Sequence, residues 1–221
     1  GFAAIVVGLE ELDEHYGNFV LAAHPGVVQM CLMHRLDQLH AAIGDVDLGL
    51  WLFDRDVDLT AGAFDAAIRV GHGDFPGCRS RLLFPEIVVP IATPAFAQQY
   101  ELDASSSAAD VYRTPLVHLD DGDRPWMTWS DWLAEFGITL RRSPGRVLFH
   151  SYPMVLQQAL LGRGVALGWR PLIDEYIDGG ALEVVGPEVR STRGYHVVWP
   201  ANGGGPVVEA LRDWLLAQPT G

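Results

Sequence analysis

One arginine lies inside an apolar segment of this chain, where its charge requires a partner. The segment FDAAIRVGHGDFPGC, residues 64–78, is typical of a short strand followed by a glycine-rich loop, and Arg69 interrupts its apolar part. A guanidinium cannot lose its proton in a protein, and leaving it buried without a partner costs about 3–5 kcal/mol. Two kinds of partner are open: an anionic group of a bound ligand, or an internal carboxylate from Asp54, Asp58 or Asp65.

Other candidates for ligand contact stand where a predicted strand gives way to a helix. His24 and Pro25 follow the first strand, and Phe53 and Asp54 end the second. His24 has the chemistry to donate a hydrogen bond to a carboxylate; otherwise it caps the helix or faces solvent. Thr93 precedes a proline at the start of another helix, which favours a helix N-cap and also permits contact with a ligand.

The later half of the chain adds a second group of candidates. His150, Ser151 and Tyr152 precede a predicted helix, whose N-terminal backbone and hydroxyl groups can serve a ligand. Trp169 ends the apolar segment GVALGW and either offers an aromatic surface to a flat or sugar-like ligand or packs in the core. In open parallel sheets, ligands bind at the carboxyl ends of strands, which is where these residues are expected.

The chain shows few signs of other chemistry. Its eight His residues have no HxxxH spacing and no grouping with Cys that is typical of a metal site. There is no GxSxG motif, and GHG at 71–73 leads to Pro-Gly instead of a helix, unlike a phosphate-binding or dinucleotide-binding loop. We therefore expect no metal, no cofactor and no enzymatic activity.

Composition indicates a globular protein. The 221 residues are 49% hydrophobic and 19% charged, and the formal net charge of −13 disfavours binding to a phosphate backbone. No apolar run reaches the ~18 residues of a membrane span and the first residues lack the features of a signal peptide, so we expect a cytoplasmic protein with no membrane partner. Cys31 lies in a predicted helix and neither Cys belongs to a CxxC pair, which favours two reduced thiols, Cys31 and Cys78.

Alternating strands and helices must position these residues. The first half predicts an amphipathic helix at 2–16, strands at 18–23, 46–53 and 64–70, and helices at 25–43 and 57–62 between those strands. One or two strands at 80–92 and a helix at 93–100 follow, then a loop at 103–110. The alternation then resumes with strands at 115–119, 146–150, 164–169, 182–185 and 193–200 and helices at 128–137, 151–163, 171–180 and 206–218. This order predicts parallel strands with right-handed crossovers in two α/β halves.

The ordered set of segments resembles LysR-type transcriptional regulators, in particular their glycine-cleavage-activator-like branch. The resemblance rests on DVDLTAGAFDAAIRVGHGDFPGCRSRLLFPEIVVPIATPAF, on MVLQQALLGRGVALGWRPLIDEYIDGGALEVV, and on GYHVVWP followed by VVEALRDWLLAQ. It covers nearly the whole chain from Asn18 onward. It implies the effector-binding part of such a bacterial regulator: an α/β fold of two Rossmann-like lobes joined by crossing strands, as in type II periplasmic binding proteins.

The resemblance also implies boundaries and partners. We expect lobe I at 18–91 plus 192–221, lobe II at 92–191, and residues 1–17 as the end of a linker helix, with the N-terminal winged helix-turn-helix missing from this chain. A small anionic metabolite is expected between the lobes, contacting Arg69 and the other candidates, and controlling DNA binding by the missing domain. A homodimer or tetramer is expected, with helix 27–43 as one contact surface. The alternative is a solute-binding receptor of a transport system.

Overall fold

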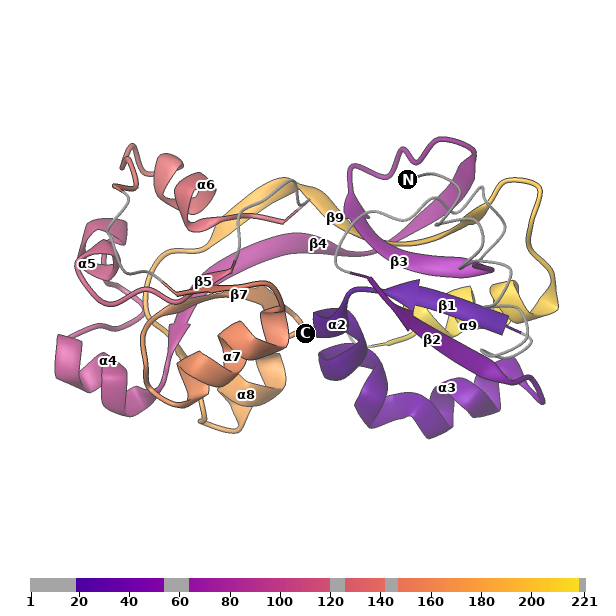
Figure 1. Ribbon diagram of the computed structural model, residues 1–221, viewed down its shortest axis with the longest axis horizontal. Coiled ribbons are helices and arrows are strands. Elements are labelled where there is room, and N and C mark those ends of the chain that lie inside the picture. Colours follow the sequence, from indigo (N-terminus) through magenta and orange to yellow (C-terminus); the bar gives the residue numbers. More distant parts are fainter. Residues whose placement is uncertain (1–18, 54–63, 120–125, 142–146, 219–221) are drawn as a thin grey trace. The chain divides into compact units, whose positions relative to one another are not determined.

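The chain forms two compact units that are linked by two long strands. The computed structural model describes residues 19–53, 64–119, 126–141 and 147–218 (Figure 1). Unit 1 comprises residues 1–84 and 193–220, and unit 2 comprises residues 85–192. Strand β4, Cys78–Ala92, carries the chain from unit 1 into unit 2, and strand β9, Val189–Pro200, carries it back. The predicted helices at 2–16 and 57–62 lie outside the described residues.

Unit 1 is built on a mixed sheet. Strand β1 (Phe19–Ala23) pairs in parallel with β2 (Leu48–Leu52) on one side and with β3 (Ala66–Gly71) on the other. Strand β9 pairs antiparallel with β3, and β4 lies next to β9, so the strand order in this unit is β2-β1-β3-β9-β4. The parallel pairing that the sequence predicts for the first three strands is confirmed. The apolar runs of β1 and β3 suit strands with neighbours on both sides.

The helical segment between β1 and β2 is interrupted, although the sequence predicts one continuous helix. It begins at Pro25 and ends before Gly44 as predicted, but it consists of α2 (Pro25–Val27), a π turn η1 (Val28–Leu32), a 3-10 turn η2 (Met33–Arg35) and α3 (Leu36–Ile43). The π turn adds a residue that shifts the helix phase, so that the apolar residues before and after it are both buried. These buried residues are Val27, Val28, Met30, Leu32, Leu39 and Ile43.

The C-terminal helix completes unit 1. Helix α9 (Pro206–Leu216) packs against α3 and buries Leu211 and Leu215 (Figure 1). The side chain of Arg35 donates a hydrogen bond of 3.3 Å to Gln218 just beyond this helix. The sequence pattern correctly predicts this helix from its apolar spacing and its initial proline.

The described residues of unit 2 form the far end of the seven-stranded sheet, a separate pair of strands and five short helices. Strand β4 pairs antiparallel with β7 (Ala166–Arg170) and with β8 (Glu183–Val184), while β5 (His118–Leu119) and β6 (Leu148–Phe149) form a separate parallel pair. The helices are α4 (Pro94–Tyr100), α5 (Ala108–Tyr112), α6 (Trp129–Ala134), α7 (Tyr152–Leu160) and α8 (Asp174–Asp178). All but α5 fall within helices that the sequence predicts.

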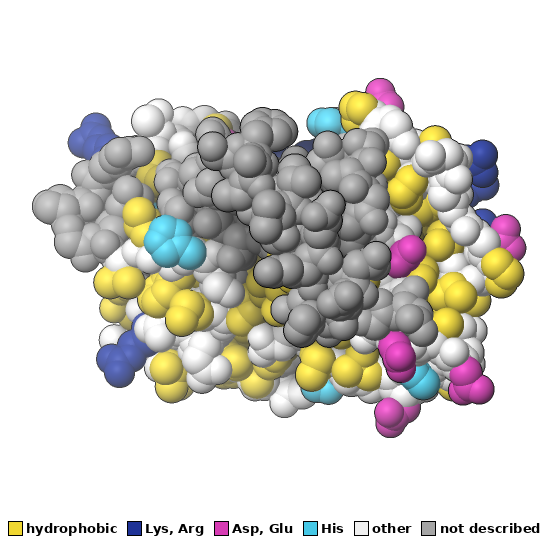
Figure 2. All heavy atoms as spheres, turned by 45° about the vertical axis from the view of Figure 1, so that its right-hand side comes forward, with side chains coloured by type: hydrophobic (Ala, Val, Ile, Leu, Met, Phe, Trp, Pro, Cys, Tyr) yellow, Lys and Arg dark blue, Asp and Glu magenta, His cyan; other side chains and the backbone are white. Residues whose placement is uncertain are grey.

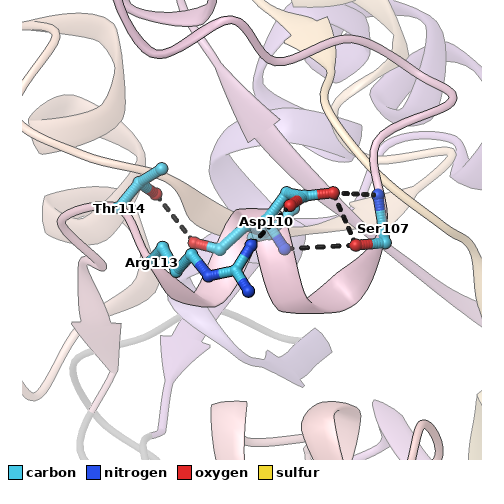
Figure 3. Close-up of polar contacts among 5 residues, drawn as sticks. Ser107, Asp110, Arg113 and Thr114 are labelled. Carbon is cyan, nitrogen blue, oxygen red and sulfur yellow. Dashed lines mark hydrogen bonds and ion pairs between the residues drawn. The ribbon is translucent and has the colours of Figure 1, made fainter.

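Helix α5 corrects the prediction of a loop at residues 103–110. The hydroxyl of Ser107 accepts a hydrogen bond from the backbone N–H of Asp110, and the Asp110 carboxylate accepts one from the backbone N–H of Ser107 (Figure 3). This reciprocal capping box satisfies N–H groups that a helix start otherwise leaves without partners. The serine-rich segment therefore starts a helix.

The chain is acidic overall, but the described residues on the side shown in Figure 2 have no concentrated charge. Among the coloured residues there, acidic side chains lie singly between hydrophobic and uncharged ones, and arginines stand singly near the edges. No helix within the described ranges has the length and apolar character needed to cross a membrane. Cys31 and Cys78 are not joined by a disulfide, as predicted.

Candidate functional site

Four side chains form a row across the carboxyl ends of β2, β1 and β3 and the adjoining part of β9. The β1–β2 and β1–β3 registers, continued by one residue, place His24 between Phe53 and Arg69. On the far side of β3, Arg69 pairs directly with His196 of β9. Because side chains alternate along a strand, all four project from the face that carries one apolar cluster. That cluster consists of Ala22, Phe53, Phe64, Ala67, Phe75 and Val198.

Aromatic rings contact the basic side chains of this row. The ring of His24 lies 4.5 Å from that of Phe53, centroid to centroid. The guanidinium carbon of Arg69 lies 4.8 Å from the centroid of Phe75, in cation–π range, and the ring of His196 meets Phe75 edge-on at 5.6 Å. Phe75 thus contacts both basic side chains, and the guanidinium of Arg69 is only partly exposed.

His196 is buried and is oriented by the glycine loop. Its Nδ1 lies 3.0 Å from the carbonyl oxygen of Gly194, which assigns the proton to Nδ1. Gly73 has a φ of +92°, and a Cβ there would lie 3.0 Å from Nε2 of His196, so this close approach requires glycine. Burial is the largest influence and lowers the pKa of His196 below its usual value; the hydrogen bond to Gly194 raises it by less, and the neighbouring His72 lowers it. His196 is therefore neutral at pH 7.

Three internal carboxylates were possible partners for Arg69, and the structure describes the position of one of them, Asp65. Asp65 precedes β3, and its carboxylate accepts a hydrogen bond of 2.7 Å from the backbone N–H of Val20. Arg69 lies four positions along the extended backbone from Asp65, which corresponds to about 13 Å. Asp65 is therefore not placed to pair with the guanidinium. Asp54 and Asp58 lie outside the described residues.

A second group of predicted site residues lies in unit 2, at the start of α7. Ser151 is the N-cap residue of this helix, but its side chain makes no capping hydrogen bond. The ring of Tyr152 meets the ring of Trp169 edge-on, with 4.8 Å between their centroids. Burial raises the pKa of the Tyr152 hydroxyl, which therefore stays protonated. His150 precedes these residues and is exposed.

Trp169 is held by a buried carboxylate. Its Nε1 donates a hydrogen bond of 3.0 Å to Oε1 of Glu86 on β4, and Oε2 of Glu86 accepts one of 2.5 Å from the hydroxyl of Ser191 on β9. Glu86 has no exposed surface and Trp169 is also buried. Trp169 is thus a residue of the unit 2 core, and its contact with Tyr152 links that core to the start of α7.

The two remaining candidates stand at helix starts. The hydroxyl of Thr93 accepts a hydrogen bond of 3.3 Å from the backbone N–H of Phe96, so the predicted N-cap of α4 is confirmed. Pro25 occupies the first turn of α2 directly after His24. Asp54 cannot be placed because it lies outside the described residues.

The structure thus brings together the unit 1 candidates and adds residues that sequence reasoning missed. Phe53, His24, Arg69 and His196 are neighbours in one row, and Phe75 contacts the last two. Alternation in the strand at 193–200 places His196 on the face of Val198, but the sequence does not reveal that β9 pairs with β3. Within the described ranges, no three His, Cys, Asp or Glu side chains are grouped to hold a metal ion.

Comparison with known protein families supports one assignment. A family model described as the LysR substrate binding domain matches residues 13–220. The glycine cleavage system transcriptional activator of Escherichia coli K12 is 27% identical over 204 residues, which are 91% of this chain and 65% of the activator. The transcriptional regulator TrpI of Pseudomonas aeruginosa is 26% identical over 92% of this chain and 68% of its own length. This chain therefore spans about two thirds of these relatives.

Solved structures show the same fold. The effector domain of the transcriptional regulator AmpR of Pseudomonas aeruginosa superposes with a TM-score of 0.69 at 24% identity, covering 90% of this chain and 92% of that one. The AmpR effector binding domain of Citrobacter freundii gives a TM-score of 0.70 at 20% identity, covering 90% and 96%. The mixed α/β architecture is thus that of these effector domains.

Proposed function

The chain belongs to the LysR substrate binding domain family, and from this premise we propose that it binds a small anionic effector through Arg69. The supporting observation is the position of that side chain. Arg69 is a permanent cation near the carboxyl end of a central strand, flanked by His24 and His196. The carboxyl ends of parallel strands are the usual place for ligands in α/β sheets.

The chemistry of the row suits a carboxylate or a similar oxyanion. A guanidinium binds such groups with two parallel hydrogen bonds, and the neighbouring imidazole of His24 can donate a third. Phe53 and Phe75 contact the basic side chains and reduce their exposure to water. A lower local dielectric strengthens the attraction between a guanidinium and an anion.

We further propose that the unit 2 candidates contact the same effector. Tyr152 supplies a neutral hydroxyl donor, and Ser151 and His150 stand beside it at the start of α7. Thr93, Pro25 and Asp54 complete the proposed set. The two lobes predicted from the sequence, and a cleft between them, are part of this proposal.

We propose that effector binding controls transcription. The relatives that this chain matches are transcriptional regulators, and the matched family is their effector-binding part, so a transport receptor is not favoured. We propose that a DNA-binding domain elsewhere in the full protein responds to the effector, because a ligand shifts a conformational equilibrium by its different affinities for the two states. We propose a dimer, in which the exposed Met33 of the helical segment lies at a subunit contact.

A ligand screen tests the effector proposal. Thermal unfolding of the chain is measured with metabolite carboxylates, and a ligand present at a hundredfold its Kd should stabilise the fold by about 2.7 kcal/mol. For a hit, Arg69→Gln should weaken binding about 10-fold to 100-fold, because a charged hydrogen-bond donor is lost. The matched control is Arg81→Gln, which removes an exposed arginine. Equal affinity of the folded Arg69→Gln variant and the wild type would refute the role of Arg69.

A further inference from the structure

We propose that His196 is a second cationic determinant of the unit 1 anion site, and that this site takes up a proton when its anionic ligand binds. The inference rests on the proposed function, since it concerns the same site. The inference adds His196, a residue that the sequence did not indicate, to the site. It also adds a form of regulation, in which the effector binds more tightly as the pH falls.

The first step is geometric. Arg69 and His196 are directly opposite each other on the antiparallel strands β3 and β9, where facing Cβ atoms are about 4.5–5.5 Å apart. Both side chains contact the ring of Phe75, the guanidinium over its face and the imidazole at its edge. An anion held by Arg69 therefore lies close enough for electrostatic attraction to a charge on His196, even without direct contact between them.

The second step concerns the proton. His196 donates from Nδ1 to the carbonyl of Gly194, so the nitrogen that gains the proton is Nε2. Burial lowers the pKa of this side chain and keeps it neutral at pH 7 when no ligand is present. A bound anion stabilises the imidazolium and raises that pKa. By linkage, the affinity for the anion then increases as the pH falls through the pKa of His196.

Among the described residues, the charged groups that lie nearest to His196 are basic. Arg69 on β3 faces His196, and His72 in the glycine loop disfavours the imidazolium, whereas Phe75 and Gly73 of that loop are uncharged. Asp74 follows in the same loop and is exposed. An anionic ligand would offset the positive charge of these neighbours and so favour the protonated form of His196.

The test uses sulfate as the probe, since it keeps its charge over the range of interest. The chain is titrated with sodium sulfate at pH 5.5 and 7.5, with sodium chloride at matched ionic strength as reference. NMR of labelled histidine side chains follows the pKa of His196. We expect sulfate to raise this pKa and to bind about fivefold more tightly at pH 5.5 than at pH 7.5.

Variants separate this linkage from the general effect of pH on an acidic protein. The net charge of −13 becomes less negative in acid, which favours any anion. His196→Asn keeps an amide that can donate to Gly194 but cannot be protonated, so most of the fivefold ratio should disappear. His40→Gln, at an exposed position of α3, should retain it. If His196→Asn is poorly folded, the pKa measured in the wild type with and without sulfate still decides.

The failures of the two proposals are distinguishable. An unchanged His196 pKa, combined with weaker sulfate binding in Arg69→Gln, would overturn the proton linkage and leave the anion site standing. Sulfate binding that neither Arg69→Gln nor His196→Asn alters would overturn both. A raised pKa that is lost in Arg69→Gln would support both.

Discussion

The indole Nε1 of Trp169 donates a hydrogen bond of 3.0 Å to the carboxylate of Glu86, a side chain with no exposed surface. Ser191 donates to the other carboxylate oxygen, so one acid connects β7 to the two strands that link the units. The sequence left open whether Trp169 serves the core or a ligand. The hydrogen bond gives it a structural role, while its contact with Tyr152 brings it next to proposed ligand-binding residues.

Replacing Trp169 by Phe should destabilise the chain by about 2–3 kcal/mol, because a buried carboxylate loses a donor and the core loses volume. Urea denaturation measures the change in the free energy of unfolding. Trp214→Phe, at a partly exposed position of α9, is the control and should cost less than 1 kcal/mol, on the order expected for a surface change. Equal effects of the two substitutions would contradict the role assigned to the Glu86 hydrogen bond.

Thr93→Ala should cost about 1 kcal/mol of stability, because α4 loses the hydroxyl that caps the backbone N–H of Phe96. Thr93→Ser keeps the hydroxyl and should restore most of this stability. Thermal unfolding without ligand makes the comparison. If Thr93→Ala leaves stability unchanged, the hydroxyl does not act as a cap in solution.

The carboxyl of Asp110 should titrate below the usual range of an aspartate. The hydrogen bond from the Ser107 hydroxyl is the largest cause of its lowered pKa, and the backbone N–H of Ser107 and the nearby Arg113 add to it (Figure 3). Since the folded pKa lies below the unfolded one, the ionised group stabilises the fold above the usual pKa of about 3.9. This stabilisation is lost as the pH falls through the folded value.

NMR titration of the side-chain carboxyl carbons measures this pKa directly. Ser107→Ala should raise the pKa of Asp110 toward the usual value, because the largest cause is removed. The carboxyl of Asp103 provides an internal reference, since its pKa is lowered by Ser105 and Ser106 instead. A pKa of Asp110 that does not respond to Ser107→Ala would refute the capping box.

Gly168→Ala should destabilise unit 2 by about 1–3 kcal/mol through overpacking. A Cβ at this position of β7 would lie 2.9 Å from Cδ1 of Ile91 and 3.1 Å from Cγ1 of Ile173. Ile91→Val removes the nearest of these atoms, so the double variant should lose less stability than the sum of the single variants. Strictly additive losses would show that Ile91 does not limit the space at Gly168.

Much of the unit 1 fold was predictable because its signals are local. Apolar strands that alternate with helices imply parallel pairing, and Pro25 and Gly44 mark the ends of the helical segment. The π turn within that segment was not predictable, since it depends on what the helix buries. Helix α5 was missed because serines are common in loops, although Ser107 and Asp110 have the spacing of a capping box.

The candidate site was predictable only within a single α/β unit. His24 and Arg69 follow from the rule that parallel strands end at the same edge of a sheet. His196 lies far away in the sequence, and only the antiparallel pairing of β9 with β3 brings it to Arg69. Glu86 was missed because a lone acid in an apolar strand gives no indication of its donors, Trp169 and Ser191.

The return of the chain along β9 has a consequence for synthesis on the ribosome. Unit 2 is one uninterrupted stretch, whereas unit 1 needs residues from both before and after it. Strand β3 therefore lacks its β9 neighbour until translation has passed residue 200, and its open edge is a hazard for aggregation of nascent chains in the meantime. We expect unit 2 to fold before unit 1 is complete, and we expect nascent chains arrested before residue 193 to need a chaperone.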